Sequence, residues 1–196
     1  MRKQLSTAIR ALLVFTLVLG VGYPLVITAI GQLALPAQAN GSLVKVDGTV
    51  VGSALIGQSF TDADGTALPE WFQSRPSAAG DGYDGGASSG SNYGPENEDL
   101  VRAIGERQAA IAERDGVTVG QIPADAVTAS GSGLDPDISP EYARLQVARV
   151  AAARGLDASA VARLVESMIA KRDLGYLGEP RVNVLRLNIA LMELDN

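Results

Sequence analysis

The sequence contains no cysteine and no histidine among its 196 residues. Without cysteine there is no disulfide framework, no thiol nucleophile and no thiolate zinc site. Without histidine the chain cannot assemble a Ser-His-Asp triad, a His-based metal site or an imidazole acid–base step. No glycine is followed by lysine, so a P-loop is also absent. The sequence therefore indicates a protein without catalytic chemistry of its own.

Aromatic residues are scarce and charge is unevenly distributed. Aromatics make up 5% of the chain, so the core must be built mainly from Ala, Val, Leu and Ile. No acidic residue precedes Asp47; all 22 acidic residues but only 13 of the 16 basic ones lie after Arg10, which gives that part a formal charge of −9. This charge disfavours nucleic acid as a partner and favours a surface that is soluble and tolerates cations.

A long uncharged stretch separates Arg10 from Lys45. Its first part, ALLVFTLVLGVGYPLVITAI, has the length of about 20 apolar residues that crosses a bilayer. Arg2, Lys3 and Arg10 precede it, and the positive-inside rule keeps that end in the cytoplasm. We predict a cytoplasmic tip over 1–10, a single transmembrane helix over 11–35 and an extracytoplasmic soluble domain over 36–196.

A cleavable secretory signal is the alternative to a retained anchor. The small residues of Ala37-Gln38-Ala39 fit a signal cleavage site. However, the apolar core of a signal is usually ~7–15 residues long, whereas this one continues to about Leu35. The retained anchor is favoured, and the large domain is exported in either case.

The exported part is predicted to be one α/β (α+β) domain. After a linker over 36–48, the segment 49–60 has the composition of a strand. Apolar periodicity indicates a helix over 97–114, and cap residues indicate one between Ser139 and Gly155. A third helix is indicated after Asp157, where a cap and an apolar stripe agree. A last apolar segment runs from 182 to 194.

Three familiar motifs occur in incomplete form. Gly80, Gly82 and Gly85 match G-x-G-x-x-G but lack the strand before and the helix after that a dinucleotide site requires. The S-x-x-K of residues 42–45 lacks the K-T-G of penicillin-binding enzymes. The sequence DADG over 62–65 begins like a calcium loop but has Gln73 at the final ligand position, so we predict a turn.

Two segments are poor in core-forming residues and adjoin well-patterned elements. One lies around Arg75 and leads into a Gly- and Ser-rich loop over 78–95; the other is the turn over 130–136. The Gly-rich turn could present amides to an anion, but Asp135 and the lack of a neighbouring lysine disfavour a phosphate site. Since binding residues usually lie on loops held by a rigid scaffold, we predict that both segments face a partner. The alternative is a turn that only reverses the chain.

Four ordered motifs behind one N-terminal span carry a resemblance to a known family. They are WFQSRPS, SSGSNYGPEN, VTASGSGLDPDISP and LGEPRVNVLRLNIAL. The chain resembles, over nearly its whole length, the C subunit of the Kdp-type potassium-transporting ATPase. It departs from the family pattern at Asp137, where the family usually has histidine, so a role of that histidine is not transferred.

The resemblance implies a non-catalytic accessory subunit of a high-affinity, ATP-driven potassium uptake complex in the bacterial inner membrane. Its expected partners are a potassium-channel-like subunit, a P-type ATPase subunit that hydrolyses ATP, a further small membrane subunit and membrane lipid. The family is described as a catalytic chaperone that raises the ATP affinity of the ATPase subunit, which implies an association with nucleotide binding. The chain itself is expected to hold no cofactor or metal, because ATP and potassium are handled by the complex.

The alternative function is an extracytoplasmic cap, or cation-gathering domain, at the potassium entrance of the channel-like subunit. An external domain cannot touch a cytoplasmic nucleotide, so an effect on ATP affinity would have to pass through the partner. The residues predicted to serve partner contact or function are Arg75, Ser77, Asn92, Asn97, Thr128, Ser130, Gly131, Ser132, Gly133, Asp135, Arg181 and Asn183.

Overall fold

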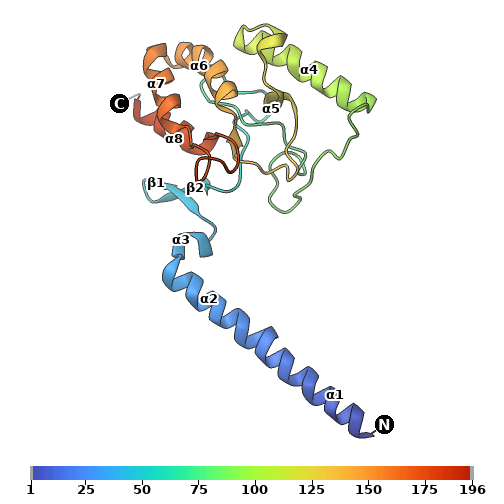
Figure 1. Ribbon diagram of the computed structural model, residues 1–196. Helices are drawn as coiled ribbons and strands as arrows, with labels where there is room; N and C mark the ends of the chain where they lie inside the picture. Colours follow the sequence, from blue (N-terminus) through green and yellow to red (C-terminus); the bar gives the residue numbers. More distant parts are fainter. Residues whose placement is uncertain (1, 195–196) are drawn as a thin grey trace. The chain divides into compact units, whose positions relative to one another are not determined.

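The computed structural model describes residues 2–194, which divide between Leu43 and Val44 into two compact units (Figure 1). The first is built on a continuous helical run of α1 (Arg2–Phe15), the π-helical η1 (Thr16–Gly22) and α2 (Tyr23–Ala34). The run has 33 residues and a mean hydropathy of 2.2 in its apolar stretch, and no residue of that stretch is buried. Within residues 2–194 it is the one helix long and apolar enough to cross a membrane. The predicted apolar helix is therefore confirmed, while its orientation remains a prediction.

A π-helical stretch precedes the proline of this helix. The backbone N–H of Tyr23 bonds the carbonyl of Val18, five residues back. Pro24 lacks an N–H and would press against the carbonyl four residues before it in a regular α-helix. The wider turn of a π-helix relieves this contact, so the helix passes the proline without ending.

A β-hairpin lies where the sequence predicts a linker. After the short α3 (Pro36–Ala39), β1 (Leu43–Val46) and β2 (Thr49–Ser53) are joined by Asp47 and Gly48, both with positive φ (49° and 80°). Two such residues make the tight turn that matches the twist of a hairpin. The predictions of a linker over 36–48 and of a strand continuing to Phe60 are therefore wrong, because Asp-Gly reverses the chain early and β2 ends at Ser53.

Four helices form most of the core of the second unit. They are α4 (Glu98–Asp115), α6 (Pro140–Arg154), α7 (Ala158–Met168) and α8 (Val184–Leu194). Helix α6 packs on α4 and on α7, which in turn contacts α8. The predicted caps Ser139 and Asp157 are confirmed, since each accepts a backbone N–H bond at a helix start, and Asn97 caps α4 in the same way. The fully or almost fully buried side chains are Phe72, Tyr142, Val150, Val161, Val165, Val182, Val184, Leu187 and Leu191.

The remaining strands place the candidate site. β3 (Asp137–Ile138) pairs antiparallel with β4 (Val182–Asn183), with Asp137 opposite Asn183. Before β3 lie a 3-10 turn, Val119–Gln121, and the short α5 (Ala124–Val127). Helices with small two-stranded sheets make this an α+β domain, which agrees with the predicted mixed class. Between residues 78 and 96 the chain forms neither helix nor strand, as expected.

Candidate functional site

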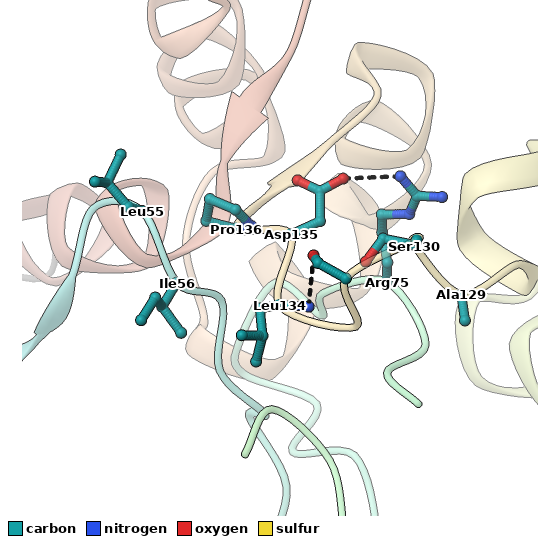
Figure 2. A pocket seen from close by; sticks show the side chains of 10 residues that line it. Leu55, Ile56, Arg75, Ala129, Ser130, Leu134, Asp135 and Pro136 are labelled. Atoms are coloured by element: carbon teal, nitrogen blue, oxygen red, sulfur yellow. Dashed lines mark hydrogen bonds and ion pairs between the residues drawn. The ribbon is translucent and has the colours of Figure 1, made fainter. Parts of the chain in front are cut away.

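An ion pair joins the two segments that the sequence analysis singles out. Arg75 Nη1 lies 2.8 Å from Asp135 Oδ2, across 60 residues of chain (Figure 2). Arg75 Nη2 donates to the carbonyl of Thr128 at 3.4 Å. The two charged side chains are 22% and 31% exposed. An ion pair in this partly buried position fixes the two segments against each other while it stays open to contact from outside.

Bonds on both sides of Arg75 hold its backbone in place. Ser74 Oγ donates to the carbonyl of Gln58 at 2.9 Å. The hydroxyl of Tyr83 donates to the carbonyl of Arg75 at 2.8 Å. Burial raises the pKa of Tyr83 to about 12, so this hydroxyl is a neutral donor at physiological pH. The Arg75 side chain therefore starts from a fixed backbone.

The Gly133 turn is built for close approach of backbone. Ser77 Oγ donates to the carbonyl of Gly133 at 2.6 Å and accepts from the backbone N–H groups of Ala79 and Tyr83. Gly133 has φ +68°, and a Cβ there would stand 2.5 Å from the carbonyl oxygen of Ser89. Only glycine fits both the left-handed backbone and this contact.

The Gly- and Ser-rich loop is attached to the same turn. The backbone N–H of Ser89 donates to the carbonyl of Ser132 at 2.9 Å, and Ser88 Oγ donates to it at 3.0 Å. Ser132 Oγ in turn accepts from the backbone N–H of Leu134 at 3.1 Å. A loop without regular secondary structure is thereby ordered through the turn that it contacts.

Two hollows share Arg75 and Asp135, and together they are called here the Arg75–Asp135 cleft. The first has a volume of about 590 Å³ and is lined by residues 129–132 and 134–136 and by Leu55 and Ile56 (Figure 2). The second, of about 670 Å³, is lined by residues of α5, β3 and the segment 178–181. The cleft is thus a wide surface depression that combines an aliphatic edge with charged groups.

The carboxylates of the second hollow are engaged by donors of the chain. Asp125 accepts from the backbone N–H of Ser139 at 2.7 Å and from its hydroxyl at 2.8 Å. Asp137 accepts from Asn183 Nδ2 at 3.2 Å and lies 3.1 Å from Arg181 Nε. Burial raises the pKa of Asp137, although the bond from Asn183 and the charge of Arg181 act against this. Residues 2–194 contain no group of three or more His, Cys, Asp or Glu side chains that could hold a metal ion.

The structure brings most of the predicted site residues together. Arg75, Ser130, Gly131, Ser132 and Asp135 line the first hollow, and Arg181 lines the second. Ser77, Thr128, Gly133 and Asn183 support these residues through the bonds described above. Their function as a partner surface remains a prediction.

Asn92 and Asn97 line neither hollow. Asn92 has φ +54° and donates to the carbonyl of Gly90 at 3.1 Å. Asn97 Oδ1 accepts from the backbone N–H groups of Asp99 and Leu100 at the start of α4. Their observed roles are local.

Sequence reasoning misses two contributions to the cleft. Leu55 and Ile56, which are 63% and 40% exposed, fall within the segment that composition assigns to a strand. The signal that could have identified them is a pair of adjacent aliphatic residues soon after Gly52-Ser53. Tyr83 lies in a loop without a helical or strand pattern, and the signal there is an aromatic residue among Gly, Ser and Asp.

Comparison with known proteins gives full-length matches. A family model described as "K+-transporting ATPase, c chain" matches residues 5–193, a range that includes all four motifs. The chain is 56% identical over 189 residues to a protein of Kineococcus radiotolerans named "Potassium-transporting ATPase KdpC subunit", covering 96% of this chain and 93% of that protein. Proteins of the same name from Mycobacterium tuberculosis and Caulobacter vibrioides are 53% and 54% identical, over 97% of this chain and 98% and 93% of theirs.

Proposed function

Because this chain belongs to the KdpC family of K+-transporting ATPase c chains, we propose that it is a non-catalytic subunit that assembles with the other subunits of a potassium-transporting ATPase. In this proposal the span fixes it in the membrane, and the Arg75–Asp135 cleft is the partner-facing surface of its folded domain. ATP is hydrolysed by another subunit.

One observation supports this role above the others. Three separate segments converge on a cleft that combines aliphatic and charged groups, as a binding surface does, without a His- or Cys-based catalytic arrangement. The ion pair of Arg75 with Asp135, the Ser130–Ser132 backbone and the Leu55–Ile56 edge all line one hollow. Such a mixture of aliphatic and charged groups on rigidly held loops is common at protein interfaces. The sequence provides no histidine or cysteine with which to add nucleophilic or imidazole chemistry.

We further propose that binding of this subunit raises the affinity of the ATPase subunit for ATP. The chain has no P-loop, so the effect would be a linkage between two binding events. Such a linkage requires that the ATPase subunit has two states and that this subunit binds them unequally. Couplings of this kind are typically ~5- to 150-fold in affinity.

The test compares the complex assembled with and without this chain. The ATP concentration for half-maximal hydrolysis should be lower, by a factor in that range, when the chain is present. The purified chain alone should hydrolyse no ATP. Failure of the chain to co-purify with the other subunits would refute the assembly role, and an unchanged ATP dependence in a fully assembled complex would refute the affinity role alone.

Acidity supports a second candidate, a cap that gathers cations at the potassium entrance. The part of the chain after Arg10 has a formal charge of −9, and Asp125, Asp137, Glu141 and Glu179 line the second hollow. Charge of one sign over a surface raises the local concentration of counter-ions. If this is the function, neutralising Glu141 and Glu179 together should raise the potassium concentration for half-maximal uptake and leave the ATP dependence unchanged. Equal changes in the potassium dependence and in the ATP dependence would argue against a cation-gathering role.

A further inference from the structure

A narrow antiparallel loop projects between α7 and β4. Ala170 and Arg181 exchange backbone hydrogen bonds of 2.8 and 3.0 Å, and Asp173 and Leu177 exchange two of 2.9 Å. The loop is closed by Leu174 and Gly175, both with positive φ (53° and 82°). Residues 174–177 are called here the Leu174 tip.

Leu174 is unfavourable in two independent ways. A branched side chain is rarely found in the left-handed region, where glycine or asparagine is accommodated at lower energy. The side chain is also 82% exposed, and it is followed by Tyr176 and Leu177 at 68% and 49%. The folded domain alone gains little from leucine at this position, because asparagine would lower the strain and remove the apolar exposure of that side chain. Strained residues of this kind persist mainly at functional sites.

Charge indicates which kind of partner the tip fits. The loop has three basic residues, but Arg172 is paired with Glu179 and Arg181 with Asp137. Lys171 stands two positions before the acidic Asp173. Binding to an anionic bilayer relies on basic groups in excess. The three basic residues of this loop are matched by Asp173 and Glu179 within it and by Asp137 of β3, the partner of Arg181. An apolar tip with tyrosine on a charge-balanced stem instead matches the anchors that fill pockets on protein partners.

The loop is also continuous with the cleft. Its returning segment, Gly178 to Arg181, lines the second hollow together with Arg75 and Asp135. A partner that covers the cleft would therefore reach the tip as well.

We propose that the Leu174 tip inserts into an apolar pocket on another subunit of the ATPase complex. This inference rests on the proposed function, since it presupposes that the chain assembles with such subunits. The tip is then an anchor of the interface, and the cleft is the surface beside it.

The first experiment measures affinity and stability together. The full-length chain in detergent is titrated into a complex prepared without it, and its own melting temperature is recorded. Leu174→Asn should weaken binding by about tenfold or more while the melting temperature stays the same or rises. Val101→Asn is the matched control, because Val101 is 60% exposed on α4 and should bind as the parent does.

The outcomes separate the two proposals. If the parent chain does not bind the complex, the proposed function fails. If the parent and Leu174→Asn bind equally, only the tip proposal fails. Should Leu174→Asn melt at a lower temperature, Tyr176→Ser replaces it, because it removes apolar surface without changing the left-handed position; parental affinity of that variant overturns the proposal.

The second experiment tests the bilayer as the occupant. The chain has no cysteine, so Leu174→Cys provides a unique site for a fluorescent label. In phosphatidylcholine nanodiscs without other subunits, the label should be quenched by iodide in water; in the assembled complex it should be shielded. Shielding from iodide in the nanodiscs alone, with quenching by doxyl-labelled lipid, would place the tip in the bilayer and overturn the proposal.

Discussion

The side-chain amide of Asn188 bonds both backbone groups of Phe72: its Oδ1 accepts from the N–H at 2.9 Å, and its Nδ2 donates to the carbonyl at 3.0 Å. Gln146, on α6, does the same for Gln73, with distances of 2.7 and 3.2 Å. Both amides are almost fully buried. The two side-chain amides make the backbone hydrogen bonds that a neighbouring strand would make in a sheet. Helices α6 and α8 therefore hold the chain just before Arg75 in place.

Asn188→Leu should destabilise the protein strongly. It keeps the approximate volume of the side chain but leaves the N–H and the carbonyl of buried Phe72 without their partner, each at about 1–3 kcal/mol. The melting temperature of the full-length chain in detergent measures this. Glu193→Leu, at an exposed position of the same helix, should change stability by less than about 0.5 kcal/mol. Equal melting of the two variants would show that the amide pairing is dispensable.

Two glycines of one turn should respond differently to alanine. At Gly133 the new Cβ would meet Ser89 O at 2.5 Å and Ala79 N at 2.7 Å, on a backbone with φ +68°. We expect Gly133→Ala to lose about 2 kcal/mol or more, by strain and displacement of the loop. At Gly131 a new Cβ would meet no atom of another segment within 4 Å, so Gly131→Ala should melt close to the parent. A parental melting temperature for Gly133→Ala would contradict the close packing of loop and turn.

Asp135→Asn tests the cleft as an interface. The variant retains an Oδ1 that can accept from the backbone N–H of Asp137, at 3.0 Å in the parent, but loses the charge that faces Arg75. Because the pair is partly exposed, we expect a loss of stability of about 1 kcal/mol or less. If the cleft binds a partner, the variant should fold and insert but co-purify less with the other subunits or support less potassium uptake. Parental assembly and uptake with lower thermal stability would identify the turn as scaffold.

Alkaline pH should weaken the fold through Tyr83. Its folded-state pKa of about 12 is above the unfolded value of 10.0 because the hydroxyl is buried. The unfolded chain therefore loses this proton first, so the stabilisation is fully present below pH 10 and is lost as the pH rises toward 12, by up to about 2–3 kcal/mol. Denaturant midpoints across this range should fall less steeply for Tyr83→Phe than for the parent. Equal slopes would mean that Tyr83 does not contribute.

The orientation of the span is tested on intact cells. Since Arg2, Lys3 and Arg10 precede the uncharged stretch, we expect protease added outside to degrade the region after Leu35 and to spare the tip. A protected domain would reverse the orientation, and a mature N-terminus at Asn40 would replace the anchor by a cleaved signal.

The sequence alone determined the elements whose rules are local. The apolar span needed only a run of residues without charge. The starts of α6 and α7 followed from Ser139 and Asp157, because a cap bonds backbone groups two or three residues away. The hairpin at Asp47-Gly48 is equally local, since its turn depends on two adjacent residues, and Asp-Gly was the signal that could have predicted it.

The tertiary structure decided everything that depends on contacts between distant segments. Arg75 meets Asp135 across 60 residues, and Phe72 meets Asn188 across 116. No periodic pattern in the sequence signals either pairing. The loop over 78–95 likewise has no repeating pattern, and its order comes from bonds to Ser132. The exposure of Leu174 was likewise beyond the sequence, because an apolar residue between Asp173 and Gly175 fits a buried position as well as a projecting tip. Burial is a property of what surrounds a side chain, and only the packed chain defines those surroundings.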